Sequence, residues 1–235
     1  RTRIGKNIRV FGIKYGQFFS LGDVKLSFHP AGHILGSAQV RMERNGEVWV
    51  ASGDYKREFD PTCEAFEVVE CDAFITEATF GTPVYRWNNE DKDIGKEIFS
   101  WWKDNHERGL NSILFAYSLG KTQRVLGLLQ PFMQRPVYCH GAAKDLIDCY
   151  RAQGVKLAPT RCLSEAMDEL KGELILGPRA ILDDKHATLL GERYETAFAS
   201  GWMARNSHGY DRGFLLSDHA DWDALIRTIQ ETKAK

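Results

Sequence analysis

Four short segments share one pattern: an apolar, strand-like run is followed closely by a side chain that could bind a metal ion. The side chains are His33, Asp54, Glu77 and His219. In layered α/β folds, ligands gather beyond the carboxyl ends of the strands. Imidazole and carboxylate groups together suit zinc or manganese, and a carboxylate can bridge two ions. The pattern therefore predicts a metal site built from segments far apart in the chain.

Each segment also has an ordinary structural explanation. Asp54 follows Ser-Gly, a common turn sequence. Asp218 and Asp221 could cap the helix expected directly after them. Glu77 could be a surface carboxylate, and a lone histidine such as His33 is more often structural than functional. The four segments therefore indicate chemistry as a set, and not one by one.

Taken together and in order, the segments AGHILGSA, ASGDYK, FITEATFG and FLLSDHAD resemble the β-CASP branch of the metallo-β-lactamase superfamily. Members of that branch are nucleases of RNA and DNA, among them cleavage-and-polyadenylation endonucleases and ribonuclease J. The runs PTCEAFEVVECDAFITEATFGTPVYRW and FAYSLGKTQRV are most similar to the bacterial ligase-associated DNA exonucleases. The resemblance extends over nearly the whole chain.

This resemblance implies a role for each residue of the set. His33 and His219 correspond to metal-binding histidines of the family, and Asp54 to the aspartate that bridges two metal ions in catalysis. Glu77 corresponds to a catalytic acidic residue that orients the site. The family's two divalent ions, zinc or alternatively manganese, activate a water for attack on a phosphodiester bond. The expected activity is that of a metal-dependent exonuclease acting on nucleic acid, with DNA as the expected substrate.

One part of the family pattern is absent. The superfamily's central signature is His-x-His-x-Asp-His, whereas the seven histidines here are residues 29, 33, 106, 140, 186, 208 and 219, and no two are separated by one residue. Relatives carry the signature upstream of the AGH loop, so we expect a fragment that is incomplete at both ends and inactive by itself. With three ligands, we expect weak or no metal binding. His208 is the nearest candidate for a proton donor, with an ordinary loop histidine as the alternative.

A second site candidate is the segment Ser118-Leu119-Gly120-Lys121-Thr122. Phe115 occupies the position where a Walker A motif needs glycine, which argues against an ATPase. A loop that enters a helix can still bind phosphate through free backbone N–H groups. An ordinary strand-to-helix turn is the alternative. The candidate contacts with a nucleic-acid backbone are Ser118, Gly120, Lys121 and Arg124.

The elements that must position these residues fall into two parts. Strands are expected at residues 7–15, 23–29, 37–44, 47–51 and 72–76, with Asn45-Gly46 predicting a hairpin. Helices are then expected at 89–107, 121–130, 142–153 and 222–233, alternating with strands at 112–117, 136–139, 173–176, 196–202 and 213–216. Such alternation is typical of a mostly parallel, helix-covered sheet.

The predicted fold class is therefore α/β. The resemblance makes the first part an incomplete metallo-β-lactamase-type αββα sandwich, formed by residues 1–81 and 198–235. Residues 82–197 are then the inserted α/β β-CASP domain. A cleft between the two domains is expected to hold the substrate.

Composition limits the class of protein. The chain has 235 residues, 43% of them hydrophobic, and a net charge of −1, which argues against a generally basic nucleic-acid binder. No apolar run approaches the roughly 20 residues that span a bilayer, so no membrane partner is expected. Five cysteines without a CxxC pair indicate free thiols in a reducing cytoplasm.

The expected partners are single-stranded DNA or RNA and, by the resemblance, DNA ligase or other repair proteins. Tyr85-Arg86-Trp87 is an aromatic and basic group of the kind that binds single strands, although such aromatics are more often core residues. An RNA 3′-end processing nuclease is the alternative enzyme. A non-catalytic β-CASP scaffold is the alternative of another class, and the presence of His33, Asp54, Glu77 and His219 argues against it. The large α/β insertion disfavours a small-molecule hydrolase.

Overall fold

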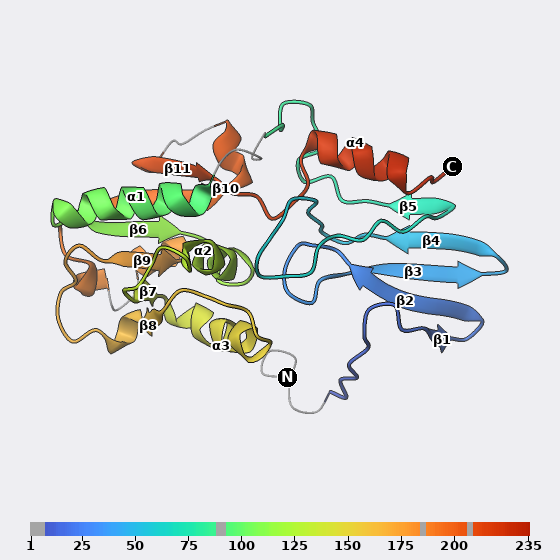
Figure 1. Ribbon diagram of the computed structural model, residues 1–235, viewed down its shortest axis with the longest axis horizontal. Helices are drawn as coiled ribbons and strands as arrows, with labels where there is room; N and C mark the ends of the chain where they lie inside the picture. Colours follow the sequence, from blue (N-terminus) through green and yellow to red (C-terminus); the bar gives the residue numbers. More distant parts are fainter. Residues whose placement is uncertain (1–7, 88–92, 184–186, 206–208) are drawn as a thin grey trace.

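A computed structural model describes residues 8–87, 93–183, 187–205 and 209–235. The chain forms two lobes, each built around its own β-sheet (Figure 1). The first lobe contains a five-stranded sheet in the order β1-β2-β3-β4-β5 and receives the C-terminal helix α4. The bounds of its elements are Phe19–Leu21 (β1), Val24–Pro30 (β2), Ala38–Arg44 (β3), Glu47–Ala51 (β4), Ala73–Ile75 (β5) and Trp222–Glu231 (α4).

The first sheet is antiparallel from β1 to β4, and β5 joins β4 in parallel. Asn45 and Gly46 connect β3 to β4 with positive φ angles of 53° and 84°, which is the backbone that a two-residue hairpin requires. The hairpin predicted from Asn-Gly is thus confirmed. α4 begins where the Asp221 carboxylate accepts a hydrogen bond from the Ala224 N–H (2.9 Å), as an N-cap does.

The two faces of this sheet differ. Val50 is fully buried on one face, where it packs with Val69 and Cys71 near the end of α4. Side chains alternate along a strand, so the neighbours of Val50 point to the other face. There Leu21, Trp49 and Ile75 are 73%, 45% and 53% exposed. The register aligns Trp49 with Met42 and Ala73 on this second face, which is therefore apolar and open to solvent.

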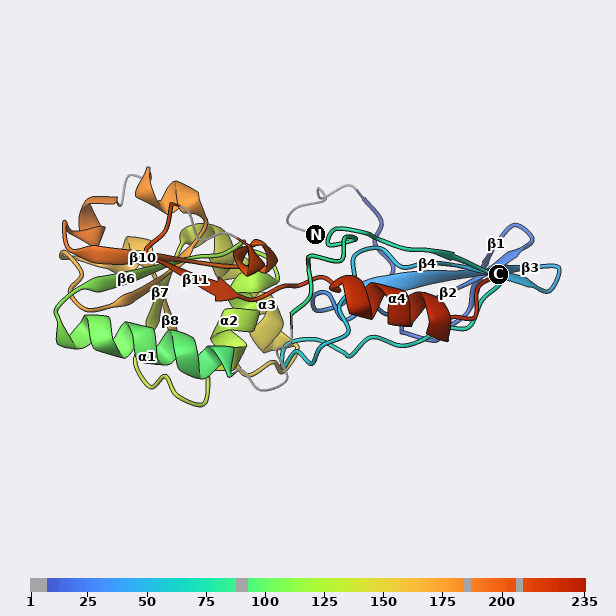
Figure 2. The same cartoon turned by 90° about the horizontal axis from the view of Figure 1, so that it is seen from above.

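The second lobe contains a parallel six-stranded sheet in the order β11-β10-β6-β9-β7-β8 (Figure 1). Figure 2 shows the helix α1 along one side of this lobe. Its strands are Asn111–Phe115 (β6), Val137–Cys139 (β7), Thr160–Cys162 (β8), Leu174–Gly177 (β9), Tyr194–Ser200 (β10) and Arg212–Leu215 (β11). Its helices are Ile94–Glu107 (α1), Lys121–Leu129 (α2) and Lys144–Ala152 (α3). Short 3₁₀ turns lie at Gly141–Ala143, Leu163–Glu165, Arg179–Leu182, Ala187–Leu190 and Gly201–Ala204.

Each face of the second sheet has its own core. Trp101 and Trp102 of α1, with Val125 and Leu126 of α2, cover one face. On the opposite face Ile113 and its neighbours pack against residues of the short turns, such as Leu163, Ile181 and Leu190. The alternating pattern of helices and strands thus gives the parallel, helix-covered sheet that it predicts.

The sequence-based elements agree with the structure except at a few places. Residues 8–15 form no strand, so the strand expected at 7–15 is wrong over its described part. β1 and β8, each three residues long, were not expected because so short a run carries no clear periodicity. The first helix begins at Ile94, capped by Asp93, while residues 89–92 of the predicted span lie outside the described residues.

The expected return to the first lobe at residue 198 is too early. β10 and β11 both belong to the second sheet, where Ser200 is aligned with Leu215. The chain therefore returns to the first lobe only after β11, through the segment that contains His219. Within the described residues, no helix has the length and apolar character needed to cross a membrane.

Candidate metal centre

His33 lies in a glycine-shaped loop between β2 and β3. Gly32 and Gly36 have positive φ angles of 71° and 77°. A Cβ at Gly32 would lie 2.5 Å from the backbone oxygen of Lys56, so only glycine fits there. The Ser37 hydroxyl accepts hydrogen bonds from the backbone N–H groups of His33 and Ile34 (3.1 and 3.2 Å). The loop thus holds His33 in one position.

The ring of His33 is oriented by the segment that follows β11. Its Nδ1–H donates to the backbone carbonyl of Asp218 over 2.8 Å. A neutral imidazole with its proton on Nδ1 has its free electron pair on Nε2. That Nε2 lies 3.8 Å from Oδ2 of Asp54, whose side chain is 56% exposed.

His219 is oriented in the same way by a carboxylate. Its Nδ1–H donates to Oε2 of Glu77 over 2.8 Å, and Oε1 of Glu77 accepts from the backbone N–H of Tyr55 (2.8 Å). Burial acts to raise the pKa of Glu77, but the hydrogen bonds from His219 and Tyr55 outweigh it and lower that pKa. Burial acts to lower the pKa of His219, whereas Glu77 raises it more strongly. A carboxylate that fixes a histidine tautomer is a common partner of metal ligands.

His33, Asp54 and His219, which we call the ligand set, converge at one point. One donor atom from each lies within 4.8 Å of the other two. The two imidazole rings are 4.9 Å apart between centroids. Two imidazoles and a carboxylate are donors of the kind that zinc binds, although they are fewer than the four protein ligands of a structural zinc site. The chemistry of these donors therefore fits a divalent ion.

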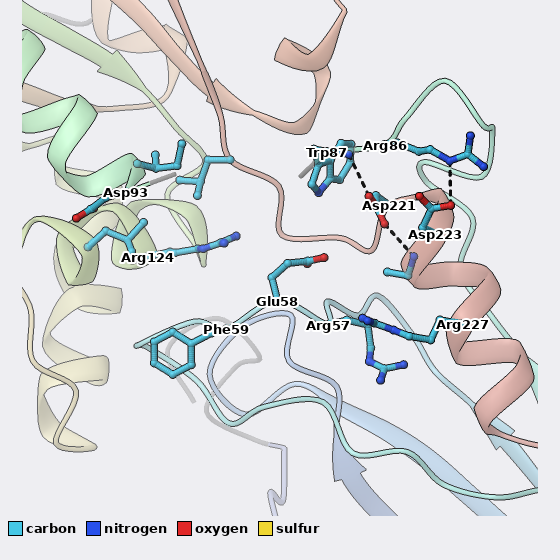
Figure 3. A pocket seen from close by; sticks show the side chains of 14 residues that line it. Arg57, Glu58, Phe59, Arg86, Trp87, Asp93, Arg124, Asp221, Asp223 and Arg227 are labelled. Carbon is cyan, nitrogen blue, oxygen red and sulfur yellow. Dashed lines mark hydrogen bonds and ion pairs between the residues drawn. The ribbon is translucent and has the colours of Figure 1, made fainter. Parts of the chain in front are cut away.

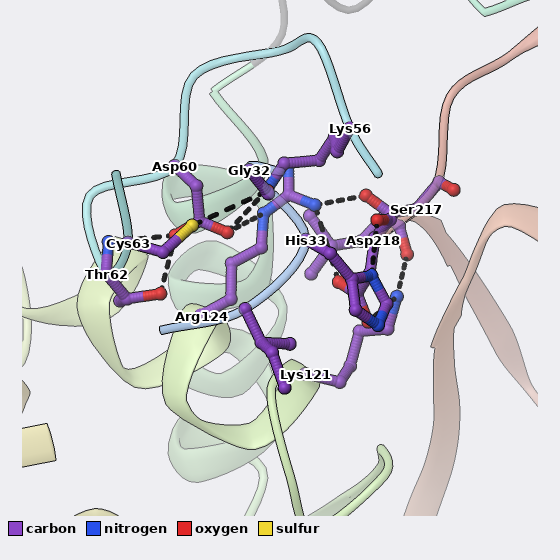
Figure 4. Close-up of polar contacts among 12 residues, drawn as sticks. Gly32, His33, Lys56, Asp60, Thr62, Cys63, Lys121, Arg124, Ser217 and Asp218 are labelled. Atoms are coloured by element: carbon purple, nitrogen blue, oxygen red, sulfur yellow. Dashed lines mark hydrogen bonds and ion pairs between the residues drawn. The ribbon is translucent and has the colours of Figure 1, made fainter. Parts of the chain in front are cut away.

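The residues predicted to bind phosphate lie elsewhere. Lys121 is 3% exposed; its ammonium group lies 2.9 Å from Oδ2 of Asp218 and donates to the backbone oxygen of Leu216 (2.7 Å) (Figure 4). Arg124 is 7% exposed and donates to the backbone oxygen of Ser217. Both side chains point into the protein and are engaged there. The expectation that they contact a nucleic-acid backbone is therefore corrected.

The backbone of that segment is also engaged. Gly120 is buried, and its N–H donates to the side chain of Gln123 (2.7 Å). The N–H groups of Lys121 and Thr122 donate to the carbonyls of Leu119 and Tyr117. Because these N–H groups have partners, the structure supports the ordinary strand-to-helix turn at Ser118 to Arg124. A Cβ at Gly120 would lie 2.3 Å from Cγ2 of Ile34, so the turn packs directly on the His33 loop.

Lys121 and Arg124 belong to a group of charged residues between the lobes, which we call the buried ionic cluster (Figure 4). Lys56, fully buried, lies 2.5 Å from Asp60, and Arg124 lies 3.4 Å from the same carboxylate. Asp218 then accepts from Lys121 and lies 3.5 Å from Arg124. Burial lowers the pKa of Lys121 to about 8 despite Asp218. Sequence reasoning did not predict this cluster, because Lys121 and Arg124 reach Asp218 and Asp60 from a distant segment.

A groove of about 990 Å³ also opens between the lobes (Figure 3). Arg57, Arg86 and Arg227 line it together with Glu58, Asp221 and Asp223. Much of this charge is already paired: Arg86 lies 2.9 Å from Asp223, and Asp221 accepts from the backbone N–H of Trp87 (3.1 Å). Cations and carboxylates balance along the groove, so its charge favours neither anions nor cations.

The remaining candidates are less accessible than the sequence indicated. Trp87 is 7% exposed and packs edge-on against Phe80, with ring centroids 4.9 Å apart. Trp87 is therefore a core residue, the alternative already considered for Tyr85-Arg86-Trp87. His208 lies outside the described residues.

Comparison with known proteins supplies relatives but no family description, since no protein-family model matches the chain. A probable DNA ligase of Opitutus terrae is 29% identical over 93% of the chain. A transcription termination factor of Methanosarcina mazei is 35% identical over 51% of the chain, and an endoribonuclease of Kluyveromyces lactis is 28% identical over 54%. The chain spans 22%, 20% and 16% of the length of these three relatives.

The likeness to the probable DNA ligase extends over almost all of the chain, and the four motifs stand in one order along it. The structure has an α/β architecture in which the parallel sheet lies, along the chain, between the third motif and the end of the last strand before His219. These relatives confirm that the chain is related to the β-CASP branch of the metallo-β-lactamase superfamily.

Proposed function

We propose that this chain contributes the ligand set and the substrate-covering lobe of a metal-dependent nuclease that hydrolyses phosphodiester bonds of DNA from an end. The single observation that carries the proposal is the convergence of donor atoms from His33, Asp54 and His219 within 4.8 Å. Glu77 supports it, because a buried carboxylate behind His219 is the arrangement that fixes a ligand histidine.

The residues of the chain have separable tasks in this proposal. His33 and His219 offer Nε2 as ligand atoms, since Asp218 and Glu77 hold their Nδ1 protons. Asp54, the most exposed member of the ligand set, offers a carboxylate that can bridge two ions. A divalent ion held by these residues, zinc or alternatively manganese, would supply an activated water by lowering its pKa from 15.7 to about 7. Glu77 keeps the His219 ring from turning during the reaction.

We propose further that the first lobe is one layer of an αββα sandwich. The apolar face that carries Leu21, Trp49 and Ile75 supports this arrangement, because a sheet face of that composition is normally covered by a second layer. β2 and β4, the strands that His33 and Asp54 follow, both end on the side of this sheet that faces the second lobe (Figure 1).

DNA as substrate is supported by a relative whose likeness covers 93% of this chain. That relative is named a probable DNA ligase, so we propose that the nuclease works with a ligase or another repair protein. A reducing compartment such as the cytoplasm fits the five cysteines, all of which are free thiols.

RNA processing is the second candidate function. The endoribonuclease of Kluyveromyces lactis shares 28% identity over about half of the chain, and this favours an RNA 3′-end processing nuclease. A non-catalytic scaffold is the candidate of another class. The oriented rings of His33 and His219 argue against it, because a scaffold has no need of two imidazoles fixed through Nδ1 with donor atoms within 4.8 Å of one carboxylate.

The test uses the protein expressed from its whole reading frame, with end-labelled DNA and RNA strands of matched sequence. We expect manganese- or zinc-dependent shortening of DNA from one end, and its loss in Asp54→Asn. Asp23→Asn is the matched control, because Asp23 is an exposed carboxylate of the same lobe that pairs with Arg44. Cleavage of RNA alone would favour the second candidate. If neither DNA nor RNA is cleaved in a metal-dependent way, the non-catalytic scaffold becomes the favoured function.

A further inference from the structure

Trp202 is 46% exposed and lies near the ligand set. It lies in the 3₁₀ turn Gly201–Ala204, directly after β10. β10 and β11 are parallel, and Ser200 is aligned with Leu215, so the turn leaves the sheet at the same edge as the segment that leads to His219. The exposed indole and the ligand set therefore occupy one side of the second lobe.

A row of aromatic rings in contact connects Trp202 to the ligand set. The Trp202 ring lies 4.8 Å from the Phe80 ring, and the Phe80 ring lies 6.2 Å from the imidazole of His219, measured between centroids. Tyr85 contacts Trp202 edge-on at 5.4 Å with an interplanar angle of 89°. Phe80 itself is 2% exposed, so Trp202 is the solvent-facing end of this aromatic group.

The position of Trp202 is held by the backbone around it. The Ser200 hydroxyl accepts a hydrogen bond from the Trp202 N–H (3.3 Å). A Cβ at Gly201 would lie 2.6 Å from Phe80 and 3.0 Å from the Ser217 side chain, so the turn packs against the segment before His219 without space for a side chain there. An aromatic ring fixed in this way loses little conformational entropy when a ligand stacks on it.

The same turn also presents a cation. Arg205 follows the turn, is exposed, and has its backbone N–H bonded to the carbonyl of Trp202. An exposed aromatic ring beside a cation is the combination with which proteins bind single strands, because the ring stacks on a base and the cation meets the phosphate.

We infer that Trp202 and Arg205 form a stacking subsite for an unpaired nucleobase of a single strand whose phosphodiester bond lies at the ligand set. This subsite rests on the proposed nuclease function and adds to it the class of substrate, a strand with unstacked bases. It also replaces Trp87, which is buried beneath Phe80, as the aromatic contact expected from the sequence.

The test measures binding without cleavage, by fluorescence anisotropy in the presence of a chelator. Labelled oligothymidylate is compared with an abasic strand of the same length, which keeps the phosphates and lacks the bases. We expect Trp202→Ala to weaken binding of oligothymidylate about tenfold and binding of the abasic strand little, since one stacked base contributes roughly that factor or more. Trp202→Phe should restore most of the affinity.

Tyr194→Ala is the matched control, because Tyr194 is 39% exposed at the opposite end of the same strand β10. It should bind both strands like the wild type, and thermal melting of each variant checks the fold. The subsite is overturned if Trp202→Ala binds oligothymidylate as tightly as the wild type or loses both strands equally, and the nuclease proposal then still stands. If the wild type binds neither strand, both proposals fail together.

Discussion

The ligand set and the buried ionic cluster lie against each other between the same two lobes, yet they differ in almost every physical respect. Asp54 of the ligand set has a side chain 56% exposed, whereas the Asp218 side chain of the cluster is 9% exposed. The carboxylate in the first group faces solvent, and its neighbour His33 has Nε2 3.8 Å away. The carboxylate in the second group, that of Asp218, lies 2.9 Å from the Lys121 ammonium group. Charge that is left open can act on a ligand, while charge that is enclosed and paired can only act on the protein.

Asp218 joins the two groups. Its carboxylate belongs to the cluster, and its backbone carbonyl orients His33 of the ligand set. Lys121 and Arg124 come from α2 of the second lobe, whereas Lys56 and Asp60 come from the first. The arrangement of the lobes is therefore fixed by the cluster directly behind the place where the ligands converge.

The largest expected effect is on the free energy of unfolding, which should fall much more when the buried ionic cluster loses a carboxylate than when the ligand set does. Asp218→Ala leaves Lys121 buried without its carboxylate, and loss of one partner of a buried ion pair costs about 3–5 kcal/mol. Asp54→Ala removes an exposed carboxylate and should change the free energy of unfolding by at most about 0.5 kcal/mol. Urea unfolding of both variants measures the difference. Equal losses would show that the contrast between open and enclosed charge has no energetic basis.

The pH dependence of the free energy of unfolding should arise from the buried ionic cluster. Burial acts to raise the pKa of Asp60, but Lys56 and Arg124 outweigh it and lower that pKa below the ordinary 3.8. Its stabilising contribution is therefore complete above pH 3.8 and disappears as the pH falls through the lowered value, at no more than about 1.4 kcal/mol per pH unit.

Urea titrations of the wild type and Asp60→Asn between pH 7 and pH 3 test this. The wild type should be the more stable protein at pH 7. The difference in free energy of unfolding between the two proteins should become smaller only below about pH 4. A gap that is constant down to pH 3 would contradict the assignment of a lowered pKa to Asp60.

A smaller effect probes the contact between the lobes. Gly120→Ala would place a methyl group 2.3 Å from Ile34 in a residue with φ of 79°, and we expect a loss of about 2–3 kcal/mol. Gly16→Ala has a similar φ of 71° and open space around its Cβ, so it should lose only the backbone term of about 1 kcal/mol. Thermal or urea unfolding compares the two. Identical losses would mean that Ile34 moves aside freely.

The smallest expected signal is metal binding by residues 1–235 alone. Three ligands give an incomplete coordination shell, so we expect weak zinc binding, reduced further by His33→Ala. His29→Ala is the control, because His29 is bonded to Ser27 and Glu67. Calorimetry that detects tight binding of two zinc ions would refute this expectation.

Sequence patterns were sufficient for most of the secondary structure and for the members of the ligand set. The Asn45-Gly46 hairpin and the capped helix at Trp222–Glu231 depend on local backbone chemistry, which adjacent residues carry. The strand expected at residues 7–15 failed because a run of β-prone residues forms no strand without a neighbour to pair with. The early domain boundary at 198 failed because periodicity reveals a strand but not the sheet that it joins.

The sequence by itself determined which residues carry donor groups and that these residues follow strands: His33, Asp54, Glu77 and His219 are read directly from their segments. Only the tertiary structure decided that Lys121 and Arg124 are enclosed and that Trp202 is exposed. The physical reason is that donor chemistry belongs to a single side chain, whereas burial and pairing depend on which distant segments fold against it.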